Sequence, residues 1–145
     1  MNKYQNLLCL VDLSDENRVI VERAAELARH YGASLTLLHV VEPLPSYAAN
    51  NIVLPDDIAI EEQLTLSAKE ALSKLTSEMG LDKATTLVEV GPTKNTILEI
   101  TKDRKIDLIV IGRHGRHGIA RLLGSTATSV VHHAPCDVLT VHVGE

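Results

Sequence analysis

The sequence predicts an α/β fold built on a doubly wound, five-stranded parallel sheet with helices on both faces. Five short runs rich in Leu, Val and Ile recur along the 145 residues, and segments with helical spacing separate them. Most of the runs are continuously apolar, which is typical of strands covered on both faces. Strands that alternate with helices indicate a parallel sheet, because parallel neighbours need crossover connections. The expected strands are NLLCLV at 6–11, SLTLLHVV at 34–41, TTLVEV at 85–90, DLIVIG at 107–112 and DVLTVHV at 137–143.

The helices expected between these strands have recognisable ends. The first runs from about Ser14 to Tyr31, since Ser14 can cap the first turn and Gly32 can cap the last. The second carries an apolar stripe that includes Leu64 and Leu72, and this stripe should face inward. The remaining boundaries are about 58–79 for the second helix, Pro92 and Thr93 for the start of the third, and Ser125 to just before Pro135 for the fourth.

Length, charge and composition argue against several classes of protein. A chain of this length can bury one core but is too short for two ordinary domains, so we expect a single domain over 1–145. A formal charge of -5 and an aromatic content of 2% argue against nucleic-acid binding. No apolar run approaches the roughly 20 residues that cross a bilayer, and the N-terminus lacks a signal-peptide layout, so we expect a cytoplasmic protein. Cys9 and Cys136 lie in apolar runs and are expected to be core residues rather than a disulfide pair.

The stretch IGRHGRHGIARLLGST, residues 111–126, follows the fourth strand and is rich in glycine and arginine. In an open parallel sheet, ligands bind outside the carboxyl ends of the strands. Glycines let backbone N–H groups approach an anion, and a helix beginning at Ser125 would direct its dipole to the same point. The alternative is a strand-to-helix turn that needs glycine only for its backbone, with solvated arginines. A Walker loop is rejected because Gly124 stands where its Lys would be, and a dinucleotide fingerprint would follow the first strand.

Other polar residues allow functional and purely structural interpretations. His39 ends the second strand, where it can contact a ligand or form a hydrogen bond near the core, and we favour the core role. A zinc site is disfavoured because the candidate ligands fall into two groups that are expected at opposite ends of the last helix. Residues 42–57 are rich in Pro, Asn and acids, and they form either a lid or a connector. The candidate metal ligands are His114 and His117 in one group, and His132, His133 and Cys136 in the other.

The chain resembles the universal stress proteins over essentially its full length. The resemblance is carried by VDLS after the first strand, LLHVVEP, EVG, DLIVIGRHGRHG, GSTATSVV and APCDVLTV. It implies a Rossmann-like sheet in the strand order 3-2-1-4-5. It also implies a homodimer, paired through the last strands around Val138 to Val143.

In the nucleotide-binding branch of that family, ATP phosphates are held by GxxG, nine residues, and then Gly with Ser or Thr. Here GRHG at 112–115 is followed by eight residues before Gly124, so the loop is one residue shorter, and Gly118 gives it freedom to compensate. The resemblance implies ATP, with Mg or Mn carried on the phosphates and Asp12 beside the adenosine or the ion. The implied nucleotide-binding residues are Asp12, Val40, Ile111, Gly112, Arg113, Gly115, Gly124, Ser125 and Thr126.

Three functions follow as hypotheses. The first is a dimeric stress-response protein that binds an adenine nucleotide and changes a surface seen by a protein partner. The second is an interaction dimer that binds no nucleotide. The third is a slow ATPase or phosphotransferase, with phosphorylation at Ser125 or Thr126. We predict no catalytic residues, because the sequence has no GxSxG elbow, triad spacing or paired carboxylates on one helical face.

Overall fold

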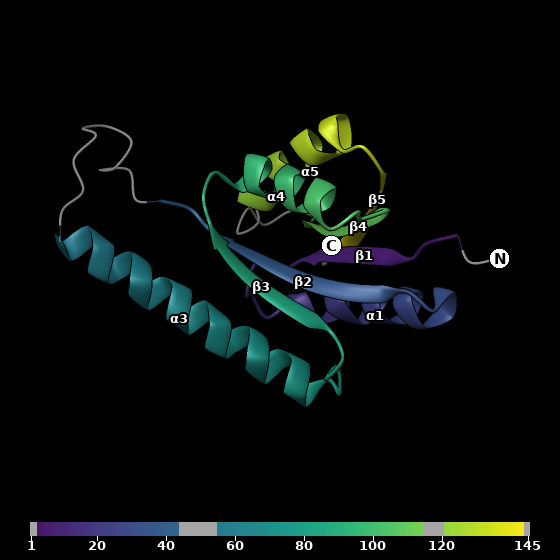
Figure 1. The fold of residues 1–145 in the computed structure, drawn as a ribbon, viewed down its shortest axis with the longest axis horizontal. Coiled ribbons are helices and arrows are strands. Elements are labelled where there is room, and N and C mark those ends of the chain that lie inside the picture. Colours follow the sequence, from purple (N-terminus) through teal and green to yellow (C-terminus); the bar gives the residue numbers. More distant parts are fainter. Residues whose placement is uncertain (1–2, 44–54, 115–120, 144–145) are drawn as a thin grey trace.

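A parallel sheet lies at the centre of the molecule, as seen in a computed structural model of the chain (Figure 1). The structure describes residues 3–43, 55–114 and 121–143. Its strands follow the order β3-β2-β1-β4-β5, all neighbours being parallel, which confirms the predicted α/β fold and strand order. The strands are β1 (Asn6–Leu10), β2 (Ser34–Val41), β3 (Thr85–Val90), β4 (Leu108–His114) and β5 (Asp137–Val143).

Helices cover both faces of this sheet. Helices α1 (Asn17–Tyr31) and α3 (Pro55–Glu78) lie on one face, and α4 (Thr93–Asp103) and α5 (Arg121–His133) lie on the other (Figure 1). Each face therefore has its own apolar core, which explains why the strand sequences are apolar at successive positions.

Strand β1 shows how one strand serves both cores. Leu7 and Cys9 belong to the cluster beneath α1, whereas Leu8 and Leu10 belong to the cluster beneath α4 and α5. Cys9 is 0% exposed, and burial raises the pKa of its thiol to about 12, which confirms its predicted role as a core residue. Cys136 is partly buried against the second cluster, and both thiols are free.

The start of α1 differs from the prediction. Ser14 does not cap the helix with its side chain, because the helix begins at Asn17 with Glu16 in the N-cap position. The chain turns before the helix instead: the Ser14 N–H donates to Asp12 Oδ1 at 2.9 Å, and the Ser14 carbonyl accepts the Asn17 N–H at 3.1 Å. The C-terminal prediction is confirmed, since Gly32 caps α1 in a left-handed conformation with φ of 64°.

Two other helices begin earlier than predicted. Helix α3 begins at Pro55, because proline suits the first helical position and the two aspartates that follow complement the helix dipole. Residues 55–57, which were expected in the interruption at 42–57, therefore belong to α3. Residues 44–54 lie outside the described part of the chain. Helix α5 begins at Arg121 rather than Ser125, since Arg and Leu are good helix formers that extend the helix toward the loop.

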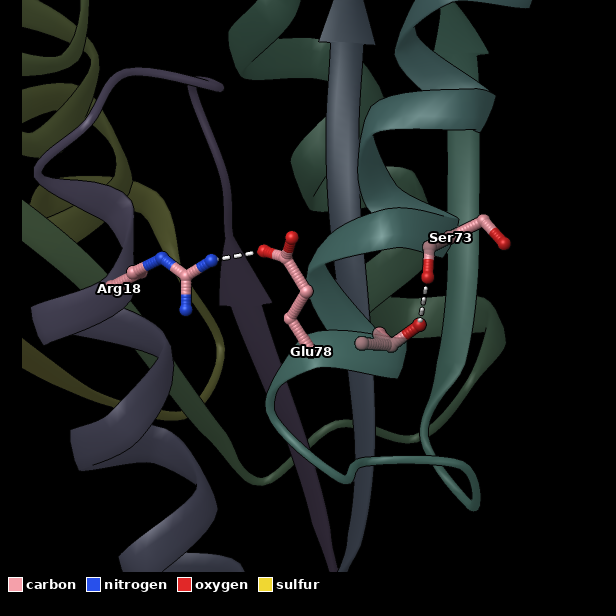
Figure 2. Close-up of polar contacts among 4 residues, drawn as sticks. Arg18, Ser73 and Glu78 are labelled. Carbon is pink, nitrogen blue, oxygen red and sulfur yellow. Dashed lines mark hydrogen bonds and ion pairs between the residues drawn. The ribbon is translucent and has the colours of Figure 1, made fainter.

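Helix α3 packs against the rest of the protein mainly through its second half. Ala68 and Leu72 are buried, and Arg18 on α1 pairs with Glu78 in the last turn of α3. Figure 2 shows these two side chains reaching across from neighbouring helices. In the first half, the large apolar residues are 40–53% exposed, namely Ile58, Ile60, Leu64 and Leu66.

Candidate functional site at the carboxyl edge of the sheet

A cavity of about 590 Å³ opens where β1 and β2 end. Helix α3 bounds it on one face of the sheet, and α4 and α5 bound it on the other. This is the edge at which open parallel sheets place their ligands. The lining consists of residues 10–14 and 38–42, with Leu64, Ser67, Ala68 and Ala71 from α3, Thr93 and Ile97 from α4, and Thr126 from α5.

The turn after β1 fixes Asp12 at this cavity. The Asp12 N–H donates to Asn17 Oδ1 at 3.1 Å, and Asn17 is only 2% exposed. Asp12 Oδ1 accepts the Ser14 N–H, so the carboxylate is held by its own turn. Leu13 has φ of 65°, a left-handed conformation that costs a residue with a side chain about 1–2 kcal/mol. Both Leu13 and Asp12 line the cavity.

The end of β2 contributes the part of the cavity wall beside the turn after β1. His39 lines the cavity and places Nδ1 2.7 Å from the Val11 carbonyl oxygen. A carbonyl oxygen can only accept, so Nδ1 carries the hydrogen and donates it. The predicted hydrogen bond of His39 is thus present, and the residue also reaches the cavity. Glu42 follows the strand and accepts a hydrogen bond from the Thr93 hydroxyl at the start of α4.

The structure brings together some of the predicted nucleotide-binding residues. Asp12, Val40 and Thr126 all line the cavity, although they come from three distant parts of the sequence. Thr126 is 9% exposed and lies on the face of α5 that turns toward the sheet. The sequence patterns that predicted these residues therefore converge at one place in the fold.

The other predicted residues lie along β4 and the start of α5. Ile111 and Gly112 are buried in β4 and do not line the cavity. Arg113 is exposed, and its guanidinium Nη2 lies 3.4 Å from Nδ1 of His142 on β5. Gly115, with Gly118 and His117, lies outside the described residues. Gly124 and Ser125 lie in the early turns of α5, where only the backbone is described.

The described lining is mostly apolar and contains acceptors rather than cations. Asp12 and Glu42 supply carboxylates and His39 supplies an imidazole, while no Lys or Arg is among the described lining residues. Leucine, valine, isoleucine and alanine make up most of the remaining wall. Such a surface suits an uncharged, flat group with hydrogen-bond donors on its rim, and it does not suit an anion.

Metal ligands were searched for among the side chains that the structure describes. No group of three or more His, Cys, Asp or Glu among them is placed to hold a metal ion. His133 instead donates from Nδ1 to the Ser129 carbonyl at 2.8 Å, so it completes the end of its own helix. His132 is exposed in the same last turn, where a basic side chain complements the helix dipole.

Glu42 and Thr93 were not identified from the sequence as residues of the site. A usable signal was present, because Glu42 directly follows an apolar strand and Thr93 opens the helix after the next strand. Polar residues in these positions meet at the carboxyl edge of a parallel sheet. Leu64 was predicted to face the core, and it lines the cavity instead.

None of the helices among the described residues is long and apolar enough to span a bilayer.

Known proteins resemble this chain over nearly its whole length. Residues 3–142 match the model of the universal stress protein family. The universal stress protein A homolog 2 of Coxiella burnetii is 40% identical over 144 residues, which cover 99% of this chain and 98% of that protein. The solved universal stress protein UspA from Lactobacillus plantarum is 30% identical, with a TM-score of 0.78 over 95% of this chain and 97% of that one.

A solved universal stress protein in complex with cAMP is also similar. It is 28% identical, with a TM-score of 0.64 over 96% of this chain and 97% of that one. The family match over 3–142, the close relative and the shared fold agree with one another. This chain belongs to the universal stress protein family.

Proposed function

We propose that this protein is a cytoplasmic, homodimeric stress-response protein that binds ATP or a related adenine nucleotide at the carboxyl edge of its sheet. Occupancy of the site would change the surface offered to a protein partner. The observation that carries the proposal is the cavity, which collects Asp12, Val40 and Thr126 from three separate segments.

The chemistry of the cavity supports this ligand class. Its apolar walls suit a purine base, and its carboxylates suit the hydroxyl groups of a sugar. The phosphates would extend toward Gly112 in β4 and toward the first turn of α5, where free N–H groups and the helix dipole favour an anion. The cAMP complex of a 28% identical universal stress protein supports an adenine nucleotide on this fold.

Magnesium or manganese would arrive with the ATP. These ions take most of their ligands from phosphate and water, so the protein need not supply a metal site of its own. Asp12 was the carboxylate expected to contribute from the sequence. Because one of its oxygens already accepts the Ser14 N–H in the turn beside β2, we assign it to the nucleoside rather than to the ion.

The dimer is proposed to form through β5. This strand lies at the edge of the sheet, paired on one side with β4, and an edge strand presents unpaired backbone groups to a second copy. Thr140 is exposed at the centre of β5. In a two-fold pairing centred near Thr140, a Thr140→Asp change would place like charges opposite each other and weaken the dimer. Light scattering across a concentration series measures this, and an unchanged dimer would place the interface elsewhere.

Calorimetric titration of nucleotide-stripped protein with ATP, with and without magnesium, tests the nucleotide proposal. AMP serves as the control ligand. We expect micromolar binding of ATP that weakens for AMP, because AMP lacks two of the phosphates that reach α5. No heat and no thermal shift at millimolar ATP would refute the site, and would favour an interaction dimer. Phosphate release that Asp12→Ala abolishes would indicate a slow ATPase.

A further inference from the structure

We infer that His39 is a specificity-determining residue that accepts a hydrogen bond from a ribose hydroxyl through Nε2, so that His39 and Asp12 together select a ligand with a vicinal diol. This inference rests on the proposed nucleotide function and goes beyond it. The ligand class it names is a ribonucleotide, as distinct from a deoxyribonucleotide.

The first step is the state of the imidazole ring. His39 Nδ1 lies 2.7 Å from the Val11 carbonyl oxygen, and that contact requires hydrogen on Nδ1. In the neutral ring, Nε2 then has a lone pair and acts as an acceptor. The backbone directly after β1 therefore fixes both the orientation of the ring and the chemical character of its second nitrogen.

The second step is the access of Nε2 to the cavity. In the described part of the chain, Nε2 has no hydrogen-bond partner. Among the described residues, three side-chain atoms are buried without a hydrogen-bond partner, and His39 Nε2 is not one of these three. An unpaired Nε2 that is not buried must be accessible, and His39 is a residue of the cavity wall. The buried and unpaired atoms are Ser14 Oγ, Asn17 Nδ2 and Glu61 Oε2.

The third step is the position of His39 beside Asp12. The carbonyl group that holds the His39 ring belongs to the peptide bond between Val11 and Asp12, so His39 and Asp12 lie at the ends of neighbouring strands, and both line the cavity. Asp12 uses Oδ1 to accept the Ser14 N–H, and a carboxylate has further lone pairs to offer. The Asp12 carboxylate and His39 Nε2 are thus two acceptors on one cavity, and they match a ligand with two neighbouring hydrogen-bond donors. A ribose presents such a pair in its 2′ and 3′ hydroxyls, whereas an adenine edge mixes donors with acceptors.

Two variants of His39 separate its two nitrogens. The amide nitrogen of His39→Asn lies near the position of Nδ1 and can still donate to the Val11 carbonyl, but nothing replaces Nε2. The longer side chain of His39→Gln places an amide near Nε2 and gives up the contact with Val11. We expect His39→Asn to bind ATP about tenfold more weakly with a thermal stability close to wild type, since one hydrogen bond is lost. His39→Gln should keep more of the affinity and lose stability.

The experiment is calorimetric titration of full-length protein with ATP, 2′-deoxyATP and 3′-deoxyATP. Wild type should bind at least one deoxy analogue about tenfold more weakly than ATP, and His39→Asn should lose that preference. Equal affinity of wild type for all three ligands would overturn the inference without any variant. Equal ATP affinity of wild type and His39→Asn would overturn it as well, and both results leave ATP binding intact. Wild-type protein that binds no ATP would overturn the proposed function and this inference together.

Discussion

The two edges of the sheet differ in how fully their polar groups are hydrogen-bonded. At the amino edge, Asp107 accepts the N–H groups of Gln5 and Asn6 at 2.9 and 3.0 Å, and the Ser34 hydroxyl donates to Asn6 Oδ1 at 2.8 Å. At the carboxyl edge, Ser14 Oγ and Asn17 Nδ2 are buried without a partner among the described residues. Buried polar groups are normally satisfied, so the amino edge is built for stability and the carboxyl edge leaves capacity for a ligand.

Neither the size of the cavity nor the strain of the backbone distinguishes the two edges. A hollow of about 680 Å³ at the amino edge, between the start of β2 and the start of β3, is larger than the candidate site. Lys105 has φ of 55° beside the amino edge, and Leu13 has φ of 65° at the carboxyl edge. Only the unpaired polar atoms distinguish the edges, and they are therefore the better indicator of a binding site.

The largest effect is expected from Asp107→Ala at the amino edge. The change removes the charged acceptor of two backbone N–H groups in the β1 segment, and the N–H of Asn6 is part-buried. We expect the free energy of unfolding to fall by about 2–3 kcal/mol, measured by urea denaturation. Asp107→Asn keeps one acceptor oxygen and should lose less. ATP affinity should stay the same in both variants, and a parallel loss of affinity would break the distinction between the edges.

The next effect is expected from Asn17→Ala at the carboxyl edge. Asn17 Oδ1 accepts the Asp12 N–H, and the side chain is almost fully buried. Its removal should lower the free energy of unfolding by about 1–2 kcal/mol and weaken ATP binding, because the turn that holds Asp12 loosens. The matched control is Arg18→Ala, one residue along the same helix. Among the described residues, the side chain of Arg18 pairs only with the exposed Glu78, so both stability and affinity should change little.

Serine-to-alanine substitutions at the two edges should change the free energy of unfolding by smaller amounts and in opposite directions. Ser34→Ala removes a satisfied hydroxyl and should lower the free energy of unfolding by about 0.5 kcal/mol. Ser14→Ala removes a buried hydroxyl that has no partner among the described residues, and it should raise the free energy of unfolding by about 0.5–1 kcal/mol. Chemical denaturation of the two variants beside wild type gives the comparison directly. Losses of equal size would mean that Ser14 Oγ has a partner in solution.

Much of the fold could be predicted from the sequence because the strands are continuous apolar runs between turn residues. The bounds predicted for β2, β3 and β5 agree with the structure. Helix starts were less predictable, because Ser14 resembles a cap but lies in a turn fixed by Asp12. The choice between these two roles depends on side-chain contacts that a local pattern does not contain.

The site was predictable only in part. Asp12, Val40 and Thr126 followed from family motifs, and the cavity now relates them in space. The contact of His39 with Val11 joins residues 28 positions apart and depends on the register of β1 against β2. The exposure of Leu64 depends on how far α3 extends beyond the sheet. Both are tertiary features, so neither periodicity nor motif spacing could indicate them.

The smallest effect is expected at the exposed rim of the amino edge, where the Tyr4 hydroxyl donates to Asp137 Oδ2 at 2.6 Å. This hydrogen bond, together with partial burial and the charge of Asp137, raises the pKa of Tyr4 from 10.0 to about 12. The folded state therefore holds the proton more tightly than the unfolded state. The resulting contribution to stability is complete below pH 10 and is lost as the pH rises toward 12. Urea denaturation across this window should show a steeper fall in the free energy of unfolding for wild type than for Tyr4→Phe. Identical slopes would mean that the amino edge does not keep this hydrogen bond in solution, and that its rim is no better satisfied than the carboxyl edge.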